Sequence, residues 1–179
     1  MIYSDNDILE GIRQKEIVID PFDMDSLNPN SYDLHLSPHL LVYTEPILDS
    51  NSENLIKRLE IGNKGYLLMP GQLYLGSTIE RTETHKAVPF LEGKSSVARL
   101  GISIHITAGV GDFGFMGHWT LEITCVKGVW IYPGMPIAQI MYFETKNHPL
   151  KKYAGNYNCQ QEWPEPSKLW KHNFFKKKQ

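Results

Sequence analysis

The sequence predicts an all-β domain with one short helix at its N-terminus. After residue 16 the chain consists of short apolar runs, many of them β-branched or aromatic, separated by turns rich in Pro, Gly, Asn and Asp. These turns recur about every ten residues, a spacing that is typical of a β-sandwich or β-barrel. A chain of 179 residues can bury a stable core without disulfides or a structural metal.

The N-terminal helix is predicted from its first turn. Ser4 and Asp7 form a capping box, in which each side chain accepts a hydrogen bond from the other residue's backbone N–H. Ile8, Leu9 and Ile12 follow at helical spacing. The helix is expected to end before residue 17, where the strand-like runs begin.

Two segments with similar sequences are predicted to be β-hairpins. Residues 66–69 and 129–132 are each followed by Pro-Gly and then by a second apolar run, at 73–79 and 137–143. Because Pro followed by Gly favours a tight turn, each unit is interpreted as strand, turn, strand. The polar residues 49–54 are predicted to form a surface loop.

The C-terminal segment differs from the rest of the chain. From residue 151 onward it is rich in Lys, Tyr and Pro and lacks strand alternation. It is therefore either a disordered tail or an arm that orders against another surface. The predicted organisation is a β-domain over residues 1–150 and a C-terminal arm over 151–179, which ends in the basic run 176–178.

Composition excludes several classes of protein. Hydrophobic residues make up 41% and charged residues 21% of the chain, which is typical of globular proteins rather than disordered or collagen-like ones. A formal net charge of -2 provides no global basic field, so no nucleic-acid polymer is expected as a partner. No apolar run approaches about 18 residues and the N-terminus is acidic, so we expect no membrane association and a cytoplasmic location.

The two cysteines do not indicate a metal site or a disulfide framework. Cys125 and Cys159 lie 34 residues apart, with no C-x-x-C motif and no His-rich segment near them. We therefore expect two free thiols and no zinc.

A phosphate-binding cluster is predicted in the run LEGKSSVARLG, where Gly93 allows close backbone approach to an anion. A P-loop is excluded, because that motif requires Gly where Val88 stands and no alternation of strands and helices surrounds it. The alternative is a solvated loop with ordinary charges. The cations and hydroxyls of the cluster are Lys94, Ser95, Ser96 and Arg99.

Alternation predicts two strands that flank a glycine-rich loop. In residues 102–107 one face carries Ile102, Ile104 and Ile106. In residues 119–124 the inward side chains are Trp119, Leu121 and Ile123, so Glu122 projects from the polar face. Taken alone, such a carboxylate is more often a solvated strand residue than a catalytic one.

The loop AGVGDFGFMG between these strands carries a single acid, Asp112. Its glycines permit tight turns, and loops on a rigid β-scaffold often carry binding residues. The alternative is that Asp112 merely forms a turn. The glycines are Gly109, Gly111, Gly114 and Gly117.

Together these elements resemble the dCTP deaminase branch of the dUTPase superfamily. The run EGKSSVARLGISIHITAGVGDFGFMGHWTLEI is similar to that family's E-G-R-S-S-x-A-R-x-G, H-x-T-A, loop Asp and G-x-x-x-L-E. The segments SYDLHL, PGQLYLGSTIE and YAGNYNCQQEWPEPSKL also resemble the family, so the similarity runs from about Ser31 to Leu169.

This resemblance implies a fold and an assembly. The expected subunit is a distorted β-barrel or jelly roll of the dUTPase type. The expected assembly is a homotrimer with three active sites built between subunits. The arm is expected to close over the bound nucleotide and to contribute Tyr153, Tyr157 and Gln160.

The resemblance also implies roles for residues of the central run. Ser95 and the carbonyl of Ala108 are expected to position water, and Glu122 to act as the general base. Asp112 is expected to contact the deoxyribose, and Thr107 the substrate. The triphosphate, with Mg²⁺ bridging its oxygens, is expected to be held by Lys94, Ser96 and Arg99.

The residue inventory is compatible with deamination that uses no zinc. Zinc deaminases carry H-x-E and P-C-x-x-C motifs, and this sequence has neither. A metal-free route requires one carboxylate to take a proton from water and return it to the substrate. Glu122 suits this role if partial burial raises its pKa.

Two residues depart from the family pattern. Lys94 stands where the family usually has Arg, so a bidentate phosphate contact becomes a point charge. Asn156 stands where bacterial deaminases often place a Lys in the arm. Both bear on recognition of the phosphates.

Three functions follow from these observations. The first is dCTP deaminase, releasing dUTP and ammonia. The second is a bifunctional enzyme that also hydrolyses dUTP to dUMP and pyrophosphate, with Asp112 orienting the second water. The third is a non-catalytic nucleotide-binding regulator. A simple dUTPase is disfavoured, because its loop usually has a Tyr after the Asp and this loop has Phe113 and Phe115.

Overall fold

The computed structural model describes residues 1–172, in which thirteen strands and four short helical segments are joined by loops. The predicted basic run at 176–178 lies outside these described residues. The helices are α1 (Asp5–Arg13), η1 (Met24–Ser26), α2 (Ser95–Ala98) and η2 (Leu169–His172). The strands are β1 (Ile17–Asp20), β2 (Leu27–Asn28), β3 (Ser31–Tyr43), β4 (Ile56–Glu60), β5 (Tyr66–Leu68), β6 (Tyr74–Thr78), β7 (Arg81–Thr84), β8 (Ala87–Gly93), β9 (Ile102–Ser103), β10 (Met116–Gly117), β11 (Thr120–Cys125), β12 (Val129–Ile131) and β13 (Pro136–Glu144).

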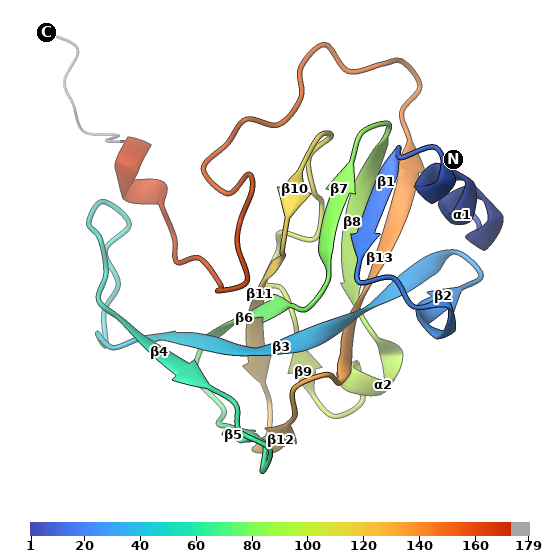
Figure 1. Ribbon diagram of the computed structural model, residues 1–179. Helices are drawn as coiled ribbons and strands as arrows, with labels where there is room; N and C mark the ends of the chain where they lie inside the picture. Colours follow the sequence, from blue (N-terminus) through green and yellow to red (C-terminus); the bar gives the residue numbers. More distant parts are fainter. Residues whose placement is uncertain (173–179) are drawn as a thin grey trace, which may run out of the picture.

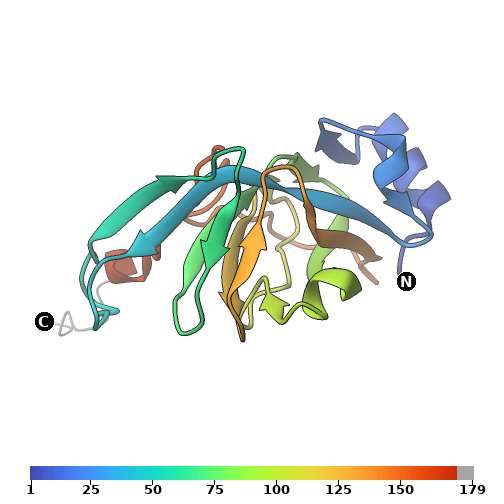
Figure 2. The same cartoon turned by 90° about the horizontal axis from the view of Figure 1, so that it is seen from below.

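The strands form three antiparallel sheets that curl into a distorted barrel (Figure 1). The largest has the order β8-β13-β3-β6-β11-β9, and β2 and β4 also pair with β3. The others are β1-β7-β10 and β12-β5. Strand β3 runs through most of the length of the molecule, as the view from below shows (Figure 2). The predicted all-β barrel with a short N-terminal helix is confirmed.

One apolar core fills the barrel. On β11 the alternation is as predicted, because Leu121 and Ile123 are buried and Trp119, just before the strand, packs partly buried against them. Within residues 1–172 no helix has the length and apolar character needed to cross a membrane. The largest fully buried side chains include Tyr32, Leu34, Leu36, Leu40, Ile131 and Tyr142.

Helix α1 has the predicted capping box. The backbone N–H of Ser4 donates to Oδ2 of Asp7 at 2.9 Å, and the N–H of Asp7 donates to Oγ of Ser4 at 3.3 Å. Ile8 is fully buried against the barrel. The helix ends at Arg13, before the first strand, as predicted.

The two predicted hairpins are wrong in their pairing, although their strands and turns are present. Gly71 and Gly134 adopt φ values of +80° and +78°, as the second central residue of a Pro-Gly turn requires. However, β5 pairs with β12, whereas β6 and β13 both pair with β3. The reason is burial. All of β6 and much of β13 are buried and join the main sheet, so each turn carries the chain from the small sheet into the large one.

The predicted strand over 102–107 is also shorter than expected. Pairing of β9 with β11 ends at Ser103, and the chain then turns away. Ile104 remains buried, but Ile106 is 62% exposed, so the prediction that it shares the inward face is wrong. Before β9, where the sequence analysis predicted no helix, the chain forms the one-turn helix α2.

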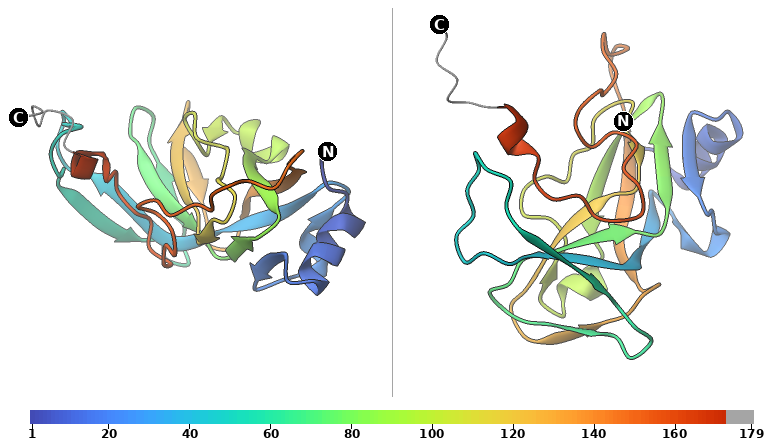
Figure 3. Two further views of the ribbon diagram at one scale, coloured as in Figure 1. Left: turned by 90° about the horizontal axis from the view of Figure 1, so that it is seen from above. Right: turned by 60° about the vertical axis from the view of Figure 1, so that its left-hand side comes forward.

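Residues 151–172 form an arm that lies against the barrel of the same chain. After β13 the arm returns along β10 and β11 toward the loop between β3 and β4 (Figure 3). The N–H of Cys159 donates to the carbonyl of Met116 at 2.7 Å, and that of His118 to the carbonyl of Gln160 at 3.1 Å. A Cβ at Gly117 would lie 2.7 Å from the backbone nitrogen of Gln160. Glycine is therefore needed for this close approach.

Candidate functional site

A pocket of about 500 Å³ lies between the arm and the barrel. Its walls come from the end of β3 and the following loop, the stretch leading into β6, the loop before β10, strand β11 and the arm. It brings together six of the predicted site residues, namely Ala108, Asp112, Glu122, Tyr153, Tyr157 and Gln160.

Glu122 projects into this pocket from the polar face of β11 and is half-buried. Burial raises the pKa of its carboxyl group above the usual value. The backbone N–H of Ile106 and the charge of His105 act in the opposite direction. The N–H of Ile106 lies 3.4 Å from Oε2 and orients the carboxylate. The group is thus placed to accept and return a proton, as a general base must.

The loop that carries Asp112 contributes one acid and an aromatic wall. Asp112 is exposed toward the pocket, while Phe115 is buried below it. The ring of Phe115 lies 4.2 Å from that of Trp119 and 6.0 Å from that of Tyr153, centroid to centroid. Because Trp119 lies in the strand's apolar alternation, the sequence assigned it only to the core.

Gln160 lines the pocket and carries an unused hydrogen-bond donor. Only 6% of the residue is exposed, and its Nε2 has no partner. A buried donor without a partner costs free energy unless a ligand or water supplies the acceptor. Because the Nε2 atom has almost no exposed surface, the side chain must shift slightly before this donor can meet an acceptor atom of a bound molecule.

The arm is held over the pocket by hydrogen bonds to its backbone. The N–H of Glu165 donates to Oγ1 of Thr120 at 3.0 Å, and the N–H of Ser167 to the hydroxyl of Tyr43 at 2.9 Å. The Ser77 hydroxyl donates to the carbonyl of Glu162. Further pocket residues that the sequence did not indicate are Leu48, Leu73, Leu75 and Val110.

The predicted phosphate cluster lies outside this pocket. Ser95 and Ser96 are exposed on α2, and Arg99 is exposed directly after it. Thr107 is exposed in the segment that follows β9. In Figure 1, α2 lies beside β9 at the lower end of the barrel, away from the arm. The structure of one chain therefore does not bring these groups to Glu122.

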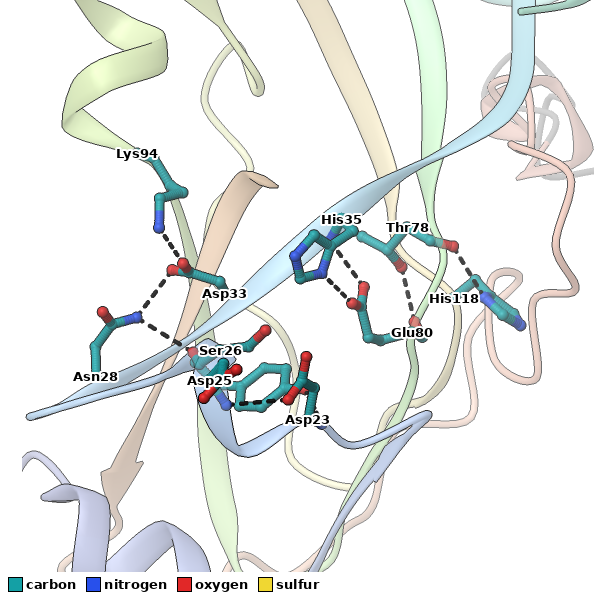
Figure 4. A network of polar contacts seen from close by, with 11 residues as sticks. Asp23, Asp25, Ser26, Asn28, Asp33, His35, Thr78, Glu80, Lys94 and His118 are labelled. Atoms are coloured by element: carbon teal, nitrogen blue, oxygen red, sulfur yellow. Dashed lines mark hydrogen bonds and ion pairs between the residues drawn. The ribbon is translucent and has the colours of Figure 1, made fainter. Parts of the chain in front are cut away.

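Lys94 is already paired with an acid of its own chain (Figure 4). Its ammonium contacts Oδ2 of Asp33 on β3, and the side-chain amide of Asn28 donates to Oδ1 at 2.9 Å. Both residues of the ion pair are largely buried. Asp33 thus holds Lys94 at the start of α2 and balances part of its charge.

A second part of the same network supports the pocket wall. The buried carboxylate of Glu80 accepts from the backbone N–H of His35 at 2.8 Å and contacts Nδ1 of that ring at 2.5 Å (Figure 4). Oγ1 of Thr78 donates to the carbonyl of Glu80 at 2.8 Å and accepts from the N–H of Trp119 at 3.0 Å. These bonds fix the backbone just ahead of β11.

In the part of the chain that the structure describes, no group of three or more His, Cys, Asp or Glu side chains is placed to hold a metal ion. Cys125 is a buried free thiol and Cys159 an exposed one, as the spacing predicted.

Comparison with protein families gives a match to the dCTP deaminase-like family model over residues 2–145. A protein of Hathewaya histolytica named "dCTP deaminase, dUMP-forming" is 50% identical over 171 residues, covering 96% of this chain and 98% of its own. Proteins with the same name from Clostridium acetobutylicum and Leptospira biflexa are 48% and 47% identical, each covering 96% of this chain and 98% and 97% of their own.

Among solved structures, the 2'-deoxycytidine 5'-triphosphate deaminase from Agrobacterium tumefaciens is similar, with a TM-score of 0.63 and 19% sequence identity. The match covers 79% of this chain and 47% of that one, so this chain spans about half the length of the solved protein. At this identity the likeness concerns the fold alone.

Proposed function

The chain belongs to the dCTP deaminase-like family, and from this premise we propose that it converts dCTP to dUMP, with release of ammonia and pyrophosphate. The observation that carries the proposal is the half-buried Glu122, whose pKa is raised, in a pocket closed by the arm. A pure nucleotide sensor needs no general base. The presence of both Glu122 and Asp112 in one pocket therefore favours an enzyme over a regulator.

The sequence analysis predicted dUTP as the product, with dUMP as the alternative. The comparisons with known proteins favour dUMP. Relatives named as dUMP-forming are 47–50% identical over nearly the whole chain. We therefore adopt the bifunctional reaction, in which dCTP and two waters give dUMP, pyrophosphate and ammonia.

For deamination, we propose that Glu122 takes a proton from a water held by the Ala108 carbonyl and a Ser95 hydroxyl. The resulting hydroxide adds to C4 of cytosine, and Glu122 passes the proton to N3 of the ring. Glu122 then transfers the proton of the new C4 hydroxyl to the amino group, so that C4 becomes a carbonyl. Cleavage of the C4–N bond then releases ammonia and leaves uracil. Positioned proton transfer of this kind contributes on the order of 10²- to 10⁴-fold to a rate.

For the second step, Asp112 contacts the deoxyribose and orients another water toward the α-phosphorus. The bond from that phosphorus to the bridging oxygen breaks, so pyrophosphate leaves and dUMP remains. Mg²⁺ would enter with the nucleotide, bound to its phosphates, and would neutralise part of their charge. We propose no zinc ion in either step.

We further propose that the site is completed by a neighbouring copy of the chain in a homotrimer. The exposed Ser95, Ser96 and Arg99 of one copy would reach the pocket of the next, where they meet the nucleotide and its phosphates. Lys94 would add its remaining hydrogen-bond donors. Over the nucleotide, the arm contributes Tyr153, Tyr157 and Gln160, the last through its unused donor. Thr107 would touch the substrate from the same loop as Ala108. The substrate class indicates a cytoplasmic location.

Product analysis tests the two-step reaction. With Mg²⁺ and dCTP, we expect ammonia and pyrophosphate to appear in equal amounts, with dUMP as the pyrimidine product. Chromatography of the nucleotides and a coupled pyrophosphate assay measure both. Parallel incubations with dCMP, dUTP and CTP show which nucleotides are accepted. Accumulation of dUTP without pyrophosphate would contradict the second step.

The pH dependence should report the state of Glu122. A general base works only when deprotonated, and burial raises the pKa of this carboxyl. Activity is therefore expected to fall as the pH drops through a midpoint above about 4.3, the value of an ordinary glutamate. Steady-state measurement of kcat/KM against pH locates this midpoint. Direct titration of dCTP binding over the same pH range shows whether protonation of the nucleotide, rather than of Glu122, causes the fall in activity. An acid limb at or below the ordinary value would contradict the assignment.

A further inference from the structure

The arm carries a tryptophan that is seated on the barrel next to the pocket. The ring of Trp163 is stacked on that of His39, with centroids 4.1 Å apart and an interplanar angle of 23°. The guanidinium carbon of Arg58 lies 5.1 Å from the centroid of the Trp163 ring. Stacked rings and an arginine over an aromatic ring both attract.

The two residues that contact this ring both lie on the sheet. His39 lies on β3 and Arg58 on β4. Arg58 is paired with Leu41, two residues beyond His39, so both side chains share one face of the sheet. Nδ1 of His39 is buried without a partner, and Nε2 lies 3.9 Å from Oε2 of Glu162, the residue before Trp163. The arm therefore covers His39 with two consecutive residues.

Trp163 is placed between the parts of the arm that form the pocket wall. Gln160 precedes it, and Glu165 and Ser167 follow it, and all three line the pocket. Trp163 does not line the pocket. Any effect of this ring on a bound nucleotide must therefore act through the position of the arm.

We propose that Trp163, seated on His39 and Arg58, is the anchor that holds the arm closed over the pocket, and so is a positioning residue for the reaction. This inference rests on the proposed function. Together, the ring stacking and the arginine–ring contact should shift the equilibrium between the closed and the open arm roughly tenfold. The apparent affinity for a ligand falls with the fraction of molecules that are competent to bind it, so losing the anchor should weaken nucleotide binding.

The experiment compares Trp163→Ala with Trp170→Ala, a matched control in the same arm whose ring is 5.6 Å from its own neighbour Lys171. Backbone hydrogen exchange reports arm closure through the N–H groups of Glu165 and Ser167. If the closed arm is favoured about three to one, a tenfold loss leaves it disfavoured about three to one. In Trp163→Ala we therefore expect these amides to exchange about three times faster and KM for dCTP to rise roughly threefold, while kcat changes less than about twofold. Trp163→Phe should recover most of the effect, and Trp170→Ala should behave as the unaltered protein.

Unchanged arm protection in Trp163→Ala, or a loss confined to kcat, would overturn the anchor. A variant on the other side of the same contact shows whether the effect of Trp163→Ala comes from loss of this contact or from general unfolding. His39→Ala should reproduce the KM effect, and the double variant should be no worse than the more affected single one, because both remove the same contact. Additive effects would also overturn the proposal. The exchange measurement needs no turnover, so it tests the anchor even if the protein does not act on dCTP. Failure of the unaltered protein to act on dCTP would refute the proposed function alone.

Discussion

Replacing Glu122 by glutamine is expected to stop ammonia release from dCTP while leaving nucleotide binding nearly intact. Glutamine has the same shape, and its side-chain oxygen can still accept from the N–H of Ile106, which lies 3.4 Å from Oε2. It cannot accept a proton from water at neutral pH. We expect kcat to fall on the order of 10²- to 10⁴-fold, the usual contribution of positioned acid–base transfer, with little change in the dissociation constant of dCTP.

Ammonia release and calorimetric binding of dCTP measure the two quantities. The matched control is Glu144→Gln, the same chemical change at an exposed residue at the end of β13, for which we expect no change in either. Deamination at an undiminished rate in Glu122→Gln would remove Glu122 from the mechanism. A parallel loss of binding would instead indicate that the carboxylate mainly holds the nucleotide.

Two inactive variants are expected to restore each other when they are produced together. Glu122 lies in the pocket, whereas Arg99 is exposed directly after α2, outside the pocket. If each site combines Glu122 of one copy with Arg99 of the next, mixed assemblies of Glu122→Gln and Arg99→Ala chains contain some sites with both residues intact. In an equal mixture about a quarter of the sites should be intact, since each residue is present with a chance of about one half.

Co-expression with two purification tags gives the mixed assemblies, and the rate is measured at a dCTP concentration well below the KM of Arg99→Ala. The matched control pairs Glu122→Gln with Asp112→Asn. Both residues line the pocket of one chain, so this mixture should release no more ammonia than the mean of the two variants. Absence of recovery in the Arg99 mixture would refute a site shared between copies.

The features that were predicted correctly have local causes. The capping box of Ser4 and Asp7 specifies the start of α1 through groups three residues apart. Alternation places Leu121 and Ile123 in the core, and so sends Glu122 to the pocket face. In each case the physical signal lies within a few neighbouring residues of the sequence.

The features that were missed depend on contacts between distant parts of the chain. The Pro-Gly turns were identified, but a turn does not select the partner of the strand that follows it, and β6 joins β3 because its residues are buried. Tyr43 and Ser167 line the pocket because the arm docks across 124 residues of sequence. Likewise, the pairing of Lys94 with Asp33 spans 61 residues. The periodicity and spacing of residues in the sequence do not predict contacts between such distant positions.

The position of β3 has a consequence for how the chain is made. Its partner β13 also pairs with β8, so β13 joins the first half of the main sheet to β8. The barrel can therefore close only after residues 136–144 have been synthesised, although residues 31–43 are made much earlier. On a ribosome the early strands would emerge with one edge unpaired, exposed to association with other chains until residues 136–144 have been made.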